Sequence, residues 1–165
     1  ARLTRADDAT VPLEERVRRA GAWQADLFVS LHFNSAADAK PSGIETYILT
    51  PAGFASTAGS SSNPRERGAR LGNRYDAANL VVGYTLHKHL LKYTHAEDRG
   101  VRRARFVVLG DAPCPAALLE CGFLSSQTER SKLLSSSYRR DLARGIAEGL
   151  LVYLNAAKRA HGLKP

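Results

Sequence analysis

The sequence predicts an α/β fold, in which a mostly parallel, twisted sheet carries helices on both of its faces. Short apolar runs typical of buried strands alternate along the chain with longer segments whose apolar residues recur at helical spacing. Strands of a parallel sheet are buried on both faces, and the connections between them are usually helices. At 165 residues, without an internal repeat, the chain is expected to form a single domain over residues 1–165.

The predicted elements follow one another in a regular order. The expected strands are 27–33, 44–49, 106–109 and 116–121, and the expected helices are 11–24, 75–93, a short helix after Ser126, and 138–160. Thr10 is the expected N-cap of the first helix, and Ser126 with Glu129 fits a capping box. Residues 51–72 are rich in Ser, Gly, Ala and Pro and predict a mobile loop within the domain, because loops of this length are usually functional or mobile.

Composition narrows the classes of protein. The net charge of +8 suits either a solvated basic surface or an anionic partner such as nucleic acid, an acidic membrane face or a carboxylate-rich cell-wall polymer. Because the arginines are dispersed and no nucleic-acid-binding motif is present, we do not expect a nucleic-acid partner. No apolar stretch approaches the ~20 residues that span a bilayer. Cys114 and Cys121 lie at the two ends of a predicted strand, too far apart for a disulfide, and are expected to be reduced or buried.

Two predicted strands end on residues that could do chemistry. His32 closes "LFVSLH" and Glu120 lies near the end of "PAALLE", and the carboxyl ends of strands form the ligand cleft in open α/β sheets. A neutral imidazole binds zinc, and a carboxylate beside an activated water can move its proton, although either residue can also be purely structural. Asn34 follows His32 by two and would hold a substrate carbonyl, orient His32 or simply end the strand. Glu45 and Arg105 are strand-associated charges that are candidates for substrate binding or for plain solvation.

Several segments resemble one known family. "ADLFVSLHFNSA" (25–36) is similar to the ADLFISIHAN-type segment of the zinc-dependent N-acetylmuramoyl-L-alanine amidases, and "CPAALLECGFLSSQTE" (114–129) resembles their PAVLVEVGFLSN segment. "DRGVRRARFVVL" (98–109) resembles the stretch before that strand, and "LTRADDATVPLEERVRRAGAWQADLF" (3–28) resembles the family's lead-in. The resemblance runs in order over nearly the whole chain, which makes it far more specific than a single motif.

What the resemblance implies is a zinc hydrolase of bacterial peptidoglycan, acting in cell-wall remodelling or daughter-cell separation. Such an enzyme cleaves the amide between N-acetylmuramic acid and the L-alanine of the stem peptide. Carried over by position, His32 matches a zinc ligand and Glu120 matches the catalytic glutamate. The implied location is periplasmic, secreted or cell-wall bound, the partner is peptidoglycan, and we expect a monomer.

The family pattern is incomplete in this sequence. The family places two further zinc ligands upstream, a histidine in a DPGHGG-like segment and a glutamate opening the next helix, and neither segment is present. We therefore expect the domain to be N-terminally incomplete and the chain alone to be weakly active or inactive. The alternative is a catalytically inactive, amidase-like module that binds peptidoglycan or regulates a partner. Residues 51–72 lack helical periodicity, so we expect an open cleft without the plugging helix of some relatives.

Overall fold

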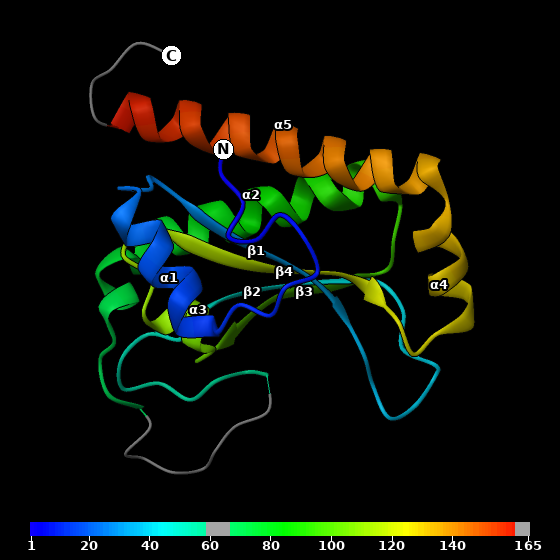
Figure 1. Ribbon diagram of the computed structural model, residues 1–165, viewed down its shortest axis with the longest axis horizontal. Helices are drawn as coiled ribbons and strands as arrows, with labels where there is room; N and C mark the ends of the chain where they lie inside the picture. Colours follow the sequence, from blue (N-terminus) through cyan, green and yellow to red (C-terminus); the bar gives the residue numbers. More distant parts are fainter. Residues whose placement is uncertain (59–66, 161–165) are drawn as a thin grey trace.

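The computed structural model describes residues 1–58 and 67–160 and contains one four-stranded sheet (Figure 1). The strands are β1 (Phe28–Asn34), β2 (Ile44–Leu49), β3 (Asp98–Ala104) and β4 (Ala116–Phe123). Their order across the sheet is β1-β4-β2-β3, with β1 parallel to β4, β2 parallel to β3, and β2 antiparallel to β4. The prediction of a mostly parallel sheet is therefore confirmed, and its antiparallel pair lies at the centre.

Helices cover both faces of the sheet (Figure 1). On one face lie α2 (Asp76–Thr94) and α5 (Ser136–Ala160), and on the other lie α1 (Leu13–Ala22) and the short α3 (Val107–Gly110). A 3₁₀ helix, η2 (Leu71–Tyr75), precedes α2, and α4 (Gln127–Leu134) connects β4 to α5. Alternate residues of each strand point to opposite faces, so the sheet separates two apolar clusters, one under α1 and α3 and one under α2 and α5.

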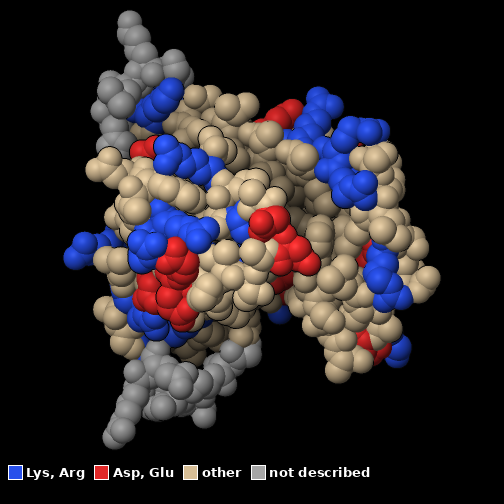
Figure 2. All heavy atoms as spheres, viewed as in Figure 1, with Lys and Arg blue, Asp and Glu red and all other residues tan. Residues whose placement is uncertain are grey.

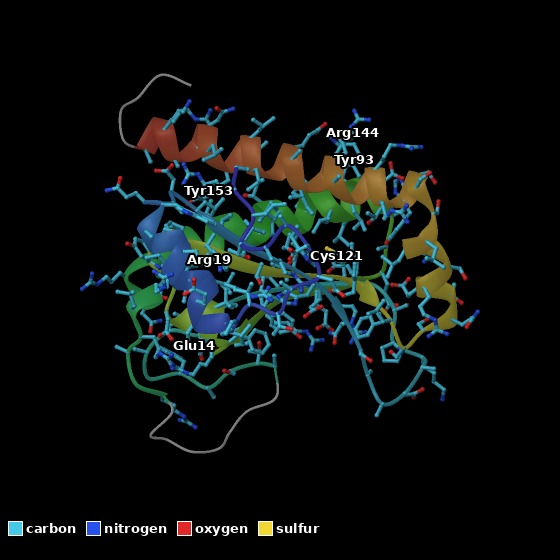
Figure 3. The ribbon with its side chains drawn as sticks, in the orientation of Figure 1. Glu14, Arg19, Tyr93, Cys121, Arg144 and Tyr153 are labelled. Atoms are coloured by element: carbon cyan, nitrogen blue, oxygen red, sulfur yellow. The ribbon has the colours of Figure 1, made fainter. Side chains whose placement is uncertain are left out.

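The two long helices lie against each other, because small residues let their backbones approach. A Cβ added at Gly145 would lie 2.9 Å from the carbonyl oxygen of His89, and one added at Gly149 would lie 3.1 Å from the Cα of Leu86. Farther along this contact, the Arg144 guanidinium lies 4.8 Å from the centre of the Tyr93 ring (Figure 3). α2 and α5 therefore cover the face of the sheet opposite to the one that carries the candidate site.

Two local predictions are wrong. The strand expected at 106–109 is instead the helix α3, and the true strand β3 lies just before it. β3 is an edge strand with charged residues at most positions, so it lacks the apolar run by which buried strands are recognised. The first helix begins at Leu13 with Pro12 at its N-cap, rather than with Thr10 there, because the residue before a proline, here Val11, disfavours helical backbone angles. The Ser126 cap is confirmed, since its hydroxyl accepts a hydrogen bond from the backbone N–H of Glu129.

The predicted loop 51–72 is only partly visible. Its residues 59–66 lie outside the described residues, and its last two residues begin η2. Basic and acidic side chains are interspersed over the face drawn in Figure 2, so the net positive charge is not gathered there into a single stripe. Among the described helices, none is long and apolar enough to cross a membrane.

Candidate active site

Three titratable side chains form a row across the sheet. In the strand register His32 of β1 is paired with Glu120 of β4, and Glu120 is paired with Glu45 of β2. Residues paired across neighbouring strands point to the same face, so an imidazole and two carboxylates stand side by side. The sequence placed His32 and Glu120 near the carboxyl ends of two predicted strands, and the register now pairs the two residues directly. The antiparallel pairing of β2 with β4 adds Glu45 to them.

Glu120 lies in the middle of the row, between His32 and Glu45. Its Oε2 atom is buried and has no hydrogen-bond partner among the described residues. Burial, and then the negative charge of Glu45, raise the pKa of Glu120 to about 7. A carboxyl group that exchanges its proton near neutral pH is suited to act as a general base and then as a general acid. Perturbed carboxylates of this kind concentrate at functional sites.

The negative charge of Glu45 helps to raise the pKa of Glu120, and Glu45 is itself kept ionised by its neighbours. Its side chain is 3% exposed, and it accepts hydrogen bonds from Arg99 Nε at 2.6 Å and from the Tyr47 hydroxyl. Burial alone would raise the pKa of Glu45, but these two hydrogen bonds hold it below its ordinary value. Sequence reasoning missed Tyr47 and Arg99. Arg99 sits on the edge strand that was not predicted, and Tyr47 alternates with Thr46 and Ile48 like an ordinary strand residue.

Both carboxylate oxygens of Glu45 accept hydrogen bonds inside the protein. Its role in substrate binding therefore stays a prediction. Arg105 is similarly engaged. Its guanidinium donates hydrogen bonds to the backbone carbonyls of Pro51, Phe54 and Gly68, among others, and so ties together the described flanks of the 51–72 loop. Arg105 thus stabilises the two described ends of this loop. Contact between Arg105 and substrate stays a prediction.

His32 and Asn34 end β1 on the same face. Nε2 of His32 lies 2.7 Å from the hydroxyl oxygen of Ser30, which fixes the ring. Burial, followed by the positive charges of Arg16 and Arg5, lowers the pKa of His32 and favours the neutral imidazole that metals bind. The side-chain oxygen of Asn34 accepts a hydrogen bond from the backbone N–H of Ser35 at 2.7 Å. This contact is typical of a residue that ends a strand, one of the alternatives left open by the sequence.

The described residues do not by themselves form a zinc site. Catalytic zinc is held by three protein ligands plus water, with nitrogen, sulfur or carboxylate donors. Within residues 1–58 and 67–160, no group of three or more His, Cys, Asp and Glu side chains could hold a metal ion. His32 offers one suitable donor in the row. Cys114 and Cys121 are free and buried as predicted, so neither forms a disulfide with the other.

The strand that carries His32 is open on its other side. β1 is at the edge of the sheet, and no described strand pairs with its outer edge. A groove of about 760 Å³ follows this side, lined by residues of β1, α1, α5 and the segment 1–5. The groove includes Ser30, which holds His32, but Glu120 does not line it. Apolar side chains are exposed along this strand, with Leu31 57% and Phe33 46% accessible.

Comparisons with known proteins agree with this architecture. The solved catalytic domain of CwlV, an N-acetylmuramoyl-L-alanine amidase from Bacillus (Paenibacillus) polymyxa var. colistinus, superposes with a TM-score of 0.75 at 30% identity, covering 93% of this chain and 72% of that one. The N-acetylmuramoyl-L-alanine amidase of Clostridium difficile 630 also gives a TM-score of 0.75 at 30% identity, covering 92% of this chain and 69% of that one.

Sequence relatives point the same way. The N-acetylmuramoyl-L-alanine amidase CwlM of Bacillus licheniformis is 32% identical over 161 residues, which are 98% of this chain and 53% of CwlM. The chain therefore spans about half the length of CwlM and of other curated relatives that it matches. A family model described as N-acetylmuramoyl-L-alanine amidase matches residues 1–152. With the family matched over nearly the whole chain and the fold shared with amidase catalytic domains, the chain belongs to the N-acetylmuramoyl-L-alanine amidase family.

Proposed function

We propose that this chain is the larger part of an amidase catalytic domain that hydrolyses the bond between N-acetylmuramic acid and L-alanine in peptidoglycan. The observation that carries the proposal is the row of His32, Glu120 and Glu45, in which one oxygen of the Glu120 carboxylate is buried without a hydrogen-bond partner among the described residues and the pKa of Glu120 is raised to about 7. Family membership supplies the substrate class. The biological setting would be cell-wall remodelling or daughter-cell separation, in the periplasm or outside the cell.

Glu120 would move the proton of the reaction. As a carboxylate it takes a proton from the attacking water while the water oxygen bonds to the amide carbon. The carboxylic acid then returns that proton to the nitrogen of L-alanine as the carbon–nitrogen bond breaks. The products are the lactyl carboxylate of the muramic acid and a stem peptide with a free amino end. A pKa of about 7 allows both halves of this cycle near neutral pH.

Zinc is part of the proposal, with His32 as one of its ligands. When bound, the metal would polarise the amide carbonyl and lower the pKa of its water. Since the described residues do not complete a three-ligand site, the remaining ligands would have to come from residues outside those described. The open edge of β1 beside His32, with its groove, supports a location for such residues next to this strand.

The test is a pair of measurements on two forms of the protein, this chain and the chain extended by whatever its coding region places before Ala1. Zinc content is measured by elemental analysis, and activity by release of peptides from purified peptidoglycan. We expect stoichiometric zinc and activity only in the extended form, with activity lost in its Glu120→Gln variant. Stoichiometric zinc on the 165-residue chain alone would overturn the assignment of ligands.

A second candidate function is an amidase-like module that binds peptidoglycan, as a monomer, without cleaving it. The lack of a three-ligand cluster among the described residues favours this reading. Glu120 argues against it, because its buried Oε2 atom has no hydrogen-bond partner among the described residues, and a binding module gains nothing from this costly arrangement. Binding to peptidoglycan without zinc and without peptide release in either form would establish the module.

A further inference from the structure

A cluster of two arginines and one carboxylate lies on β2 and β3, beside Glu120. Arg99 is committed within it. Its Nε donates to Glu45 at 2.6 Å, and its guanidinium lies 5.0 Å from the centre of the Phe123 ring. Arg102 lies farther out, with its Nη2 3.8 Å from the same Glu45 oxygen, beyond hydrogen-bond distance. The guanidinium groups of Arg99 and Arg102 therefore lie near one carboxylate, that of Glu45. Arg99 neutralises this carboxylate, so the charge of Arg102 is not balanced within the cluster.

Arg102 keeps most of its donors free. Its only hydrogen bond within the described residues runs from Nε to the backbone carbonyl of Arg99 at 3.3 Å, and its side chain is 36% exposed. That contact holds the inner end of the guanidinium, and the two outer nitrogens form no hydrogen bond within the described residues. A planar guanidinium presents paired N–H groups that match the two oxygens of a carboxylate. The geometry thus suits an anion that approaches along the sheet.

The position of Arg102 relative to Glu120 indicates which carboxylate of the substrate could bind to it. Arg102 is paired with Tyr47, so its backbone lies two strand spacings across and two residues along the sheet from that of Glu120, or about 12 Å. Its guanidinium reaches back toward the site, with Nη2 3.8 Å from Glu45, the neighbour of Glu120 across one strand spacing. An extended peptide advances at most about 3.5 Å per residue, so a guanidinium held beside Glu45 lies within reach of the second or third residue after the cleaved bond. In stem peptides the residue after L-alanine is D-glutamate joined through its γ-carboxyl, whose α-carboxylate is free unless it is amidated.

We propose that Arg102 binds the α-carboxylate of the stem-peptide residue that follows L-alanine, and so makes the site prefer acidic over amidated stems. This inference rests on the proposed function, since it assigns a place to that substrate. Arg102 would be a specificity determinant: it touches substrate away from the reacting bond, and Glu45 and Arg99 hold it at the rim of the cluster.

Binding of two matched ligands tests the inference. The 165-residue chain is titrated calorimetrically with N-acetylmuramyl-L-alanyl-γ-D-glutamyl-L-lysine and with its carboxamide counterpart, N-acetylmuramyl-L-alanyl-D-isoglutaminyl-L-lysine, which differ only at the α-carboxyl of the second residue. We expect the carboxylate ligand to bind about tenfold more tightly, in line with a hydrogen bond to a charged group. Arg102→Gln should remove that preference, and Arg102→Lys should retain part of it because the charge remains while the paired donors are lost.

Arg103→Gln is the matched control. It removes the same charge from the next position of β3, whose side chain points to the other face of the sheet. Equal affinity of the unaltered chain for both ligands, or an equal loss of preference in Arg103→Gln, would overturn the role of Arg102 and leave the amidase proposal standing. Failure to bind either ligand would count against both, and circular dichroism of each variant excludes misfolding as the cause.

Discussion

Replacement of Glu120 by glutamine should make the protein more stable at alkaline pH. The folded chain raises the pKa of this carboxyl from 4.5 to about 7, through burial and the nearby charge of Glu45. Between these two values the folded state holds a proton that the unfolded state has released. Stability must therefore fall as the pH rises through this window, and it levels off above the folded pKa. Glutamine has nearly the same shape and carries no charge, so the variant escapes this loss.

The magnitude follows from the shift. A change of about two and a half pKa units corresponds to about 3 kcal/mol at 1.36 kcal/mol per unit. Glu120 is only partly buried, and solvent screening reduces the figure, so we expect a gain of about 1–2 kcal/mol for Glu120→Gln at pH 8. At pH 4, where the unaltered carboxyl is protonated in the folded state, the two proteins should agree within about 0.5 kcal/mol.

Urea unfolding followed by circular dichroism at pH 4, 6 and 8, with a metal chelator present, measures this difference. Glu14→Gln is a control of opposite sign. Glu14 is an exposed carboxylate in the first turn of α1 (Figure 3), where a negative charge stabilises the helix end. Its loss should lower stability at pH 8 by about 0.3–1 kcal/mol. A Glu120→Gln variant that is no more stable than the unaltered protein at pH 8 would refute the burial and charge argument for this site.

Three further substitutions test the surroundings of the site by urea unfolding. Glu45→Gln should lower the free energy of unfolding by about 3 kcal/mol, because it leaves the Arg99 guanidinium without its negative partner. It should also move the pH profile of peptide release to lower pH, because the charge of Glu45 no longer raises the pKa of Glu120. An unchanged profile would contradict the influence of Glu45 on Glu120. Asn79→Ala should cost about 2–3 kcal/mol, because the buried amide bonds to the backbone of Ala116 at 2.7 Å and of Gly72 at 3.2 Å; a loss below about 0.5 kcal/mol would show that water replaces it. Gly83→Ala should cost about 1–3 kcal/mol, because its Cβ would lie 2.5 Å from a methyl group of Ile48, and unaltered stability would mean that α2 shifts freely on the sheet.

Local patterning was sufficient to predict the central strands and to place two site residues. The run 44–49 was predicted with its observed bounds, because Ile44, Thr46 and Ile48 alternate with Glu45 and Tyr47 as in a strand. His32 and Glu120 were expected together because the carboxyl ends of parallel strands share an edge, and β1 and β4 are parallel neighbours. Both inferences use only sequence periodicity and a general property of open sheets.

The charge environment of the site could not be predicted in the same way. The pairing of Glu45 with Glu120 depends on the antiparallel register of β2 against β4, which is set by tertiary packing. The ion pair of Glu45 with Arg99 depends on β3, whose charged sequence resembles a turn until the strand is seen at the sheet edge. The raised pKa of Glu120 results from burial and then from the charge of Glu45, and both depend on the fold.

The most direct test of the amidase assignment is the chemical identity of the bond that is cleaved. Purified peptidoglycan is incubated with the zinc-loaded, extended protein and with its Glu120→Gln variant, and the released peptides are sequenced by mass spectrometry. The account predicts peptides with a free N-terminal L-alanine from the unaltered protein and none above background from the variant. Equal release of such peptides by the variant would contradict the central role of Glu120, and release of sugars or of peptides with another terminus would contradict the assigned reaction.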